Sequence, residues 1–178
     1  AREVESGLLQ QALGEALRTQ LQDYYEVLSL LVSKSSGGAL SLRSLWTWLL
    51  APLARLRFLS SLSEASQGII GGALSSTVFA FSQSGDSLVQ ETATKILGSV
   101  VKPLLAMVRA WMTEGELQDP FGEFFVVADA SVPLEDLWNR MYRLEVEMVP
   151  SFMTLSLARK ILLTGKSVNF VRLCCPGH

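Results

Sequence analysis

Apolar residues recur at intervals of three and four along most of the chain, and the longest regular series lies in its middle. Its members are Val89, Ala93, Ile96, Val100, Leu104, Met107 and Trp111. This spacing places them on one face of an α-helix. Asp86 stands where a helix N-cap is expected, and Gly115 stands where a helix can end in a left-handed conformation. We therefore predict one long helix between these two residues.

Two further long helices are predicted before this one. The first covers about residues 6–33, and its apolar stripe is Leu9, Leu13, Leu17, Leu21, Tyr24, Leu28 and Leu31. The second begins near Ser41, a good N-cap residue. Its stripe is Leu42, Leu45, Leu49, Leu53, Leu56 and Leu59. Because Pro52 removes a backbone hydrogen bond and clashes with the preceding turn, we expect a kink or two abutting helices there.

The remaining helical segments are shorter or are delimited by proline. Residues 73–81 are a short helix candidate, Pro133 begins a helix that reaches Pro150, and a last helix starts after Thr154. The helix after Pro133 is expected to run through Leu137, Trp138, Met141, Leu144 and Met148. In the last helix the inward positions are expected to be Leu157, Ile161, Val168 and Val171, and the mostly outward ones Arg159, Lys160, Lys166 and Arg172. Pro103 should bend the long central helix.

The alternation of apolar and polar residues that is typical of strands is almost absent. The pattern therefore predicts an all-α fold, an elongated bundle of roughly seven helices with several kinks at proline. At most one short extended segment is expected, near residues 124–127, where the composition is strand-like. The length of 178 residues fits a single helical domain over 1–178, with possible sub-bundles 1–68 and 69–178.

The stretch from Trp111 to Phe125 connects the long helix to the C-terminal third of the chain. Trp111 ends the apolar stripe, Gly115 ends the helix, and Asp119 before Pro120 indicates a turn. We expect six residues to fix the fold of this turn, with Asp119 as a cap and Glu123 as a surface contact. They are Trp111, Gly115, Asp119, Pro120, Glu123 and Phe124. Four carboxylates within ten residues could also form an acid/base pair or a cation site, but carboxylates at a helix end and a solvated turn are far commoner.

Composition narrows the function classes. Apolar residues make up 49% of the chain and charged residues 18%, which is compatible either with large interfaces or with a generous core. The net charge of -2 gives no indication of nucleic-acid binding. No uninterrupted apolar run reaches the ~18 residues of a membrane span, so none is expected. The only cysteines, Cys174 and Cys175, are adjacent and cannot form a disulfide framework, which favours a reducing, intracellular compartment.

No catalytic, cofactor-binding or metal-binding residue is expected. The segment 164–167 reads Thr-Gly-Lys-Ser, like the end of a phosphate-binding loop, but Lys160 stands where the first glycine is needed and the context is helical. We interpret Gly165 instead as a close-packed helix residue. The only histidine, His178, is the last residue, and the cysteine pair lacks metal-ligand spacing.

Three blocks together, Trp111–Phe125, Tyr142–Met153 and Ala158–Arg172, resemble the N-terminal conserved domain of gamma-tubulin complex components. Segments 9–17, 71–74 and 84–86 agree with this resemblance in the same order. Within the family, the Leu137-Trp138 block and Pro150-Ser-Phe-Met153 resemble component 3 most, with component 2 as the next choice.

This resemblance implies a non-enzymatic scaffold. In this family the N-terminal half is expected to pack side by side with neighbouring components, here most of all component 2. The C-terminal half, outside this chain, is expected to hold gamma-tubulin. The row of components would then serve microtubule nucleation at spindle poles and other microtubule organising centres, in the cytoplasm and cytoskeleton. Neither a nucleic acid nor a cofactor is implied.

Tryptophan and arginine are favoured anchors at protein interfaces. The chain offers five candidates for a partner interface: Trp46, Trp48, Arg55, Arg57 and Trp138. Trp46 and Trp48 lie on different helix faces, so at least one should face outward or toward a neighbouring layer. Ordinary burial or a solvated charge remains the alternative for each. The alternative function is a stand-alone helical adaptor that binds a partner helix or a membrane surface.

Overall fold

The computed structural model describes residues 7–129 except 37–40, residue 131, and residues 137–174. The described part contains five α-helices rather than the roughly seven expected. They are α1 (Leu8–Ser36), α2 (Leu42–Ala65), α3 (Gly71–Ser82), α4 (Ser87–Glu114) and α5 (Leu155–Cys174). Strands β1 (Val126–Ala128) and β2 (Tyr142–Leu144) form a small antiparallel sheet in which Val126 pairs with Leu144. Pro133, Cys175 and His178 lie outside the described residues.

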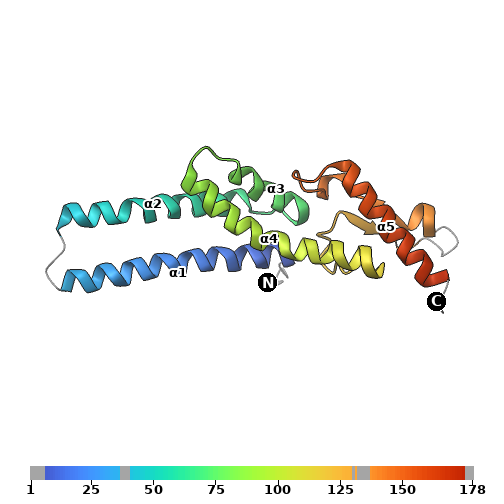
Figure 1. Cartoon of the computed structure of the whole chain (residues 1–178), viewed down its shortest axis with the longest axis horizontal. Coiled ribbons are helices and arrows are strands. Elements are labelled where there is room, and N and C mark those ends of the chain that lie inside the picture. The colour runs from blue at the N-terminus through green and yellow to red at the C-terminus, as the bar shows by residue number, and fades with distance from the viewer. Residues whose placement is uncertain (1–6, 37–40, 130, 132–136, 175–178) are drawn as a thin grey trace.

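The molecule is elongated, as predicted (Figure 1). Helices α1 and α2 lie side by side as a hairpin that extends to one end, α4 runs through the middle beside α3, and the small sheet and α5 form the other end. The buried core includes Leu9 from α1, Leu62 from α2, Val78 from α3, Val100 from α4 and Ile161 from α5. One core therefore joins elements from both halves of the chain.

Helix α4 is the central element of that core. Its predicted stripe is buried from Ala93 to Trp111, while Val89 is partly buried. The predicted caps are confirmed: the Asp86 carboxylate accepts from the amides of Leu88 and Val89, and Gly115 adopts a left-handed conformation with φ of 65°. These caps satisfy backbone groups that have no partner within the helix.

By length and composition alone, α4 could cross a membrane, since its mean hydropathy reaches 1.3. The core helix of a water-soluble protein can have the same length and apolar composition. Helix α4 packs against α1, α3 and α5, and its apolar stripe contributes to the shared core. In the structure, 33% of its apolar window is buried.

Both proline-containing helices are continuous. Helix α2 begins at the predicted cap, where the Ser44 amide donates to the Ser41 hydroxyl at 3.2 Å, and it runs through Pro52 without a break. The prediction of two abutting helices at Pro52 is therefore wrong. Helix α4 likewise runs through Pro103. One missing hydrogen bond is tolerated because the neighbouring turns keep theirs; a bend at either proline stays a prediction.

The predicted helix from Pro133 to Pro150 is wrong in the described residues. A one-turn π-helix, η2 (Leu137–Met141), leads into β2, and a 3-10 turn, η3 (Val146–Met148), comes after it. The physical reason is pairing with β1. Tyr142 and Leu144 are partly buried, while Arg143 between them is exposed. This alternation covers only three residues, so the helical spacing of the surrounding apolar residues masks it in the sequence. The structure thus has two short extended segments where at most one was expected.

Candidate functional site

Trp111 lies at the junction of α4, α5 and β2. Its ring is fully buried, and the indole Nε1 donates to the backbone oxygen of Ile161 at 3.1 Å. The ring centroid of Tyr142 lies 4.8 Å away. Gly165 packs against the indole so closely that a Cβ there would overlap the ring. The segment 164–167 is therefore part of a helix with a close-packed glycine, as interpreted from the sequence.

The turn after α4 is held by a carboxylate. Asp119 accepts from the amides of Glu123 and Phe124, each at 2.9 Å. Phe124 and Phe125 are buried with their ring centroids 4.4 Å apart, whereas Pro120 is exposed. Asp119 thus caps the turn, and the chain after it enters the core.

Glu123 is buried, with 1% of its surface exposed, and does not make the expected surface contact. Its Oε2 accepts from the amide of Leu9 at 3.1 Å, at the start of α1. The first amides of a helix lack partners within the helix and favour negative charge. Gly7 packs directly on the carboxylate, leaving no room for a Cβ. Glu123 therefore joins the central turn to α1, a role that spacing could not reveal because 114 residues separate the two partners.

The end of α4 is also held by side chains from α5. Asn169 Nδ2 donates to the Gly115 oxygen at 2.7 Å, and Arg172 donates to the Glu114 oxygen at 3.0 Å. Arg172 also pairs with the Glu116 carboxylate at 2.6 Å. Hydrogen bonds from Gln118 and Arg172 lower the pKa of Glu116. These contacts neutralise the carbonyl end of α4.

The inward face of α5 differs from the predicted one. Leu157 and Val171, expected inward, are 48% and 57% exposed, whereas Lys166, expected outward, is buried. The Lys166 amine donates to the Trp138 backbone oxygen at 3.0 Å, and burial lowers the pKa of the amine. Gly165 packs on the Trp111 ring and Lys166 bonds to the Trp138 carbonyl, so the face of α5 that carries them turns inward and the face with Leu157 and Val171 turns outward. The buried residues of α5 are Ala158, Ile161, Gly165, Lys166 and Asn169.

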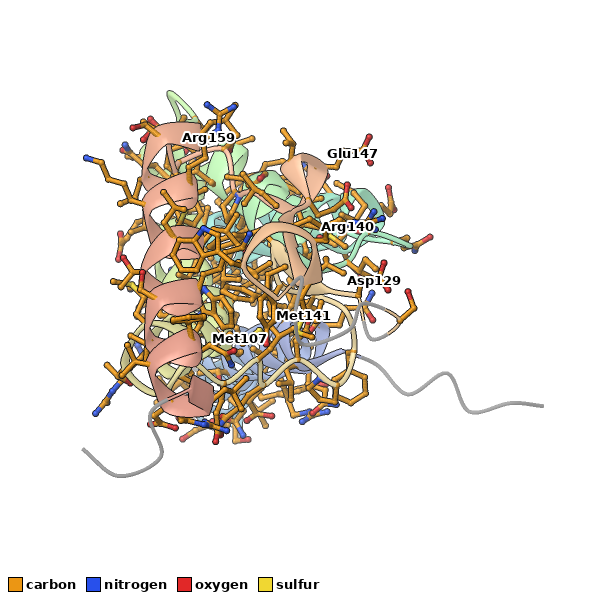
Figure 2. The ribbon with its side chains drawn as sticks, turned by 90° about the vertical axis from the view of Figure 1, so that its right-hand side faces the viewer. Met107, Asp129, Arg140, Met141, Glu147 and Arg159 are labelled. Carbon is orange, nitrogen blue, oxygen red and sulfur yellow. The ribbon has the colours of Figure 1, made fainter. Side chains whose placement is uncertain are left out.

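Figure 2 views the molecule from the end that carries α5. Arg159 lies on α5, while Arg140 of η2, Glu147 of η3 and Asp129, just after β1, lie to the other side. Hydrogen bonds from Ser131 lower the pKa of Asp129. Among the residues described, no group of three His, Cys, Asp or Glu side chains could hold a metal ion. Leu163 and Phe170 of α5 are also exposed, so this end of the molecule is a mixed charged and apolar surface.

The five candidate interface residues fall into two groups. Trp46 and Trp48 are 62% and 48% exposed, and with Arg55 and Arg57 they lie on α2. Trp138 is 43% exposed and lies beside α5, where its ring meets Phe170 at a centroid distance of 6.1 Å. The structure therefore does not bring all five together, since the hairpin and α5 occupy opposite ends (Figure 1).

The α2 side of the hairpin exposes a group of large apolar side chains near its tip. We call Leu42, Trp46 and Leu50, which follow one another at intervals of four residues on one face of α2, the hairpin patch; they are exposed by 84%, 62% and 50%. Trp48 lies on a different face of α2, where the Lys34 amine of α1 lies 4.0 Å from its ring centroid in a cation-π contact. The patch is thus an exposed apolar surface on a different side of α2 from Trp48.

A pocket of about 260 Å³ opens between α1 and α2 further along the hairpin; we call it the hairpin pocket. It is lined by Gln20, Asp23, Tyr24, Val27, Trp48, Ala51, Pro52, Arg55, Leu56 and Leu59. Arg55 Nη1 lies 3.8 Å from Asp23 Oδ2, while Arg55 Nε is buried without a partner in the described residues. Arg57 is exposed and does not line the pocket. Sequence reasoning selected Trp48 and Arg55 but could not predict the pocket, which depends on how the two helices align.

Comparison with known proteins gives matches that agree with the family resemblance seen in the sequence. The family described as gamma tubulin complex component N-terminal matches residues 1–177. Gamma-tubulin complex component 3 from Arabidopsis thaliana is 41% identical over 97% of this chain, and the Homo sapiens protein of that name is 38% identical over 95%. Spindle pole body component 98 from Dictyostelium discoideum is 34% identical over 78% of the chain.

The chain spans only about a fifth of the length of the relatives it matches, 22% of the Arabidopsis thaliana protein and 20% of the Homo sapiens protein. The two component 3 relatives agree with the branch that the sequence blocks indicated. The family match covers almost every residue, including the Trp111 junction, the Glu123 contact and the helical hairpin. This chain belongs to the family of gamma-tubulin complex components and corresponds to their N-terminal domain.

Proposed function

We propose that this chain is a non-enzymatic scaffold module that associates side by side with neighbouring components of the gamma-tubulin complex. Residues 1–178 act in this proposal as one helical domain. The observation that carries it is the family match across residues 1–177, together with relatives named as gamma-tubulin complex components. Gamma-tubulin itself would be held by the part of such proteins that this chain does not contain.

The exposed surface supports an assembly role. Monomeric proteins rarely expose large contiguous apolar patches, and aromatic residues are enriched at protein interfaces. The hairpin patch and the Trp138–Phe170 pair both expose such side chains, at opposite ends of the molecule. A member of a row needs two different contact surfaces, one for each neighbour, because such contacts are head to tail. These two surfaces are our candidates.

We propose component 2 as the first partner and the microtubule organising centre, including the spindle pole, as the place of action. A relative named as a spindle pole body component supports this location. The row of components would bring gamma-tubulins together and so promote microtubule nucleation in the cytoplasm. A stable lateral contact needs on the order of 800 Å² per partner.

The test is sedimentation velocity of this chain, alone and mixed with the equivalent N-terminal domain of component 2, at micromolar concentration. The proposal predicts a one-to-one complex. In that complex, Trp46→Ala should weaken association if the hairpin patch is buried, and Trp138→Ala should weaken it if the α5 end is buried. Two monomeric species in the mixture would instead favour the helical-adaptor alternative.

A further inference from the structure

The hairpin pocket has the size and the walls of a site for one side chain. Its volume of about 260 Å³ is below the roughly 300 to 1,000 Å³ of sites that enclose a whole small ligand. Its walls are mainly apolar, with Val27 from α1 and Leu56 and Leu59 from α2, and with the rings of Tyr24 and Trp48. An apolar side chain from a partner is therefore a better match than a free metabolite.

The pocket exists because α2 has small side chains where it faces α1. Ala51 and Pro52 both line the pocket, and neither has a long side chain to fill the space between the helices. Pro52 also has no N–H to donate to the Trp48 carbonyl one turn earlier, so that carbonyl lacks its usual helical partner. Trp48, which carries this carbonyl, also lines the pocket.

The pocket also contains an unused donor. Arg55 Nε is buried and has no hydrogen-bond partner among the described residues, and the nearest carboxylate, Asp23, lies 3.8 Å from Nη1. A buried donor without an acceptor destabilises a protein relative to one that is paired. An oxygen carried by the occupant would supply the missing acceptor.

Charge indicates what kind of chain carries that oxygen. Residues 20–57 contain four Lys or Arg and two Asp or Glu, a net charge of +2. The rest of the chain contains 11 Lys or Arg and 15 Asp or Glu, a net charge of -4. The outer part of the hairpin, residues 20–57, which carries most of the pocket, is thus complementary to an acidic surface.

We propose that the hairpin pocket receives an apolar side chain from an acidic segment of the neighbouring component, with an oxygen of that segment accepting from Arg55 Nε. This inference rests on the proposed lateral association and names the point of contact within it. The pocket would act as the central anchor of that contact.

The test uses two matched pairs of variants in the same sedimentation assay with the component 2 domain. Ala51→Phe fills the pocket, whereas Ala54→Phe adds the same ring three residues away at an exposed position that does not line it. Arg55→Lys keeps the charge but removes Nε, and Arg109→Lys, at an exposed position of α4 that does not line the pocket, is its control. We expect Ala51→Phe and Arg55→Lys to raise the Kd at least tenfold, and both controls to stay within twofold. Circular dichroism and the Tm of each variant check its folding.

The outcomes separate this inference from the proposed function. If the wild-type chain binds component 2 and Ala51→Phe binds equally well, the pocket is not the contact point, while lateral association stands. If Ala51→Phe weakens binding but Arg55→Lys binds as well as the wild-type chain, the proposed hydrogen bond from Arg55 Nε to the partner is wrong. If the wild-type chain does not bind, the proposed function fails and the pocket inference fails with it.

Discussion

At the scale of single residues, the fold depends on a few side chains that join distant segments. Trp111 contacts α5 and β2 through its ring and its indole N–H, and Glu123 bonds to the start of α1. Both side chains are buried, so neither is accessible to a ligand. Both are therefore explained by the assembly of the fold.

Trp111→Ala should lower the free energy of unfolding by about 3 to 5 kcal/mol, because the ring is fully buried and its loss leaves a cavity. Urea unfolding followed by circular dichroism measures this. The neighbouring residue Met112 is 37% exposed, so Met112→Ala is the control and should change stability by about 0.5 kcal/mol or less. A loss below about 1 kcal/mol for Trp111→Ala would remove its assignment as the junction residue.

Substitutions at two glycines near the start of the chain test the hydrogen bond between Glu123 and the Leu9 amide. A methyl group on Gly7 would displace the carboxylate from the Leu9 amide, so Gly7→Ala should destabilise the protein by about 1 to 3 kcal/mol. A methyl group on Gly14 meets nothing within 4 Å, and Gly14→Ala should stabilise α1 by about 0.5 to 1 kcal/mol. Thermal unfolding of both variants gives the comparison. Equal effects of the two substitutions would contradict the contact.

At the scale of elements, the α4–α5 packing is the contact on which the C-terminal end depends. Gly165→Ala would place a methyl group into the Trp111 ring and should cost about 1 to 3 kcal/mol. Gly98 lies in the open on α4, so Gly98→Ala should instead stabilise by about 0.5 to 1 kcal/mol. Chemical denaturation distinguishes the two signs, and a neutral or stabilising Gly165→Ala would mean that α5 does not pack as described.

Elements specified by local signals could be predicted from the sequence. Asp86 and Ser41 cap their helices, and Gly115 ends α4, because each of these effects depends on residues within one turn. Trp46 and Trp48, which the helical period places on different faces, are both exposed, and at least one was expected to be. The predictions were therefore confirmed where the physical cause was short in range.

Elements specified by distant contacts could not be predicted. Strand β2 forms because Tyr142–Leu144 pairs with Val126–Ala128, which overrides a helical spacing of apolar residues. The inward position of Lys166 depends on the Trp138 carbonyl, 28 residues away. The hairpin pocket depends on the alignment of α1 with α2, and the separation of Trp138 from the α2 candidates depends on the whole fold. None of these has a signature within a window of one helix.

At the scale of the whole molecule, the shape, the exposed apolar groups and the charge distribution fit a protein that assembles in a row with its neighbours. The domain is long, has one core joining all five described helices, and exposes apolar groups near both ends. Residues 20–57 carry a net charge of +2 and the rest of the chain -4. Such a division favours contacts between unlike surfaces of neighbours, because surfaces of like charge repel one another.

The most direct test of this account is the state of the chain when mixed with the N-terminal domain of component 2. Sedimentation velocity at micromolar concentration should show a one-to-one complex that is absent from either protein alone. The complex should weaken as salt is raised, since screening reduces the attraction between exposed charges. Two species that sediment as monomers at every concentration and salt level would contradict the claim that this domain is a lateral assembly module.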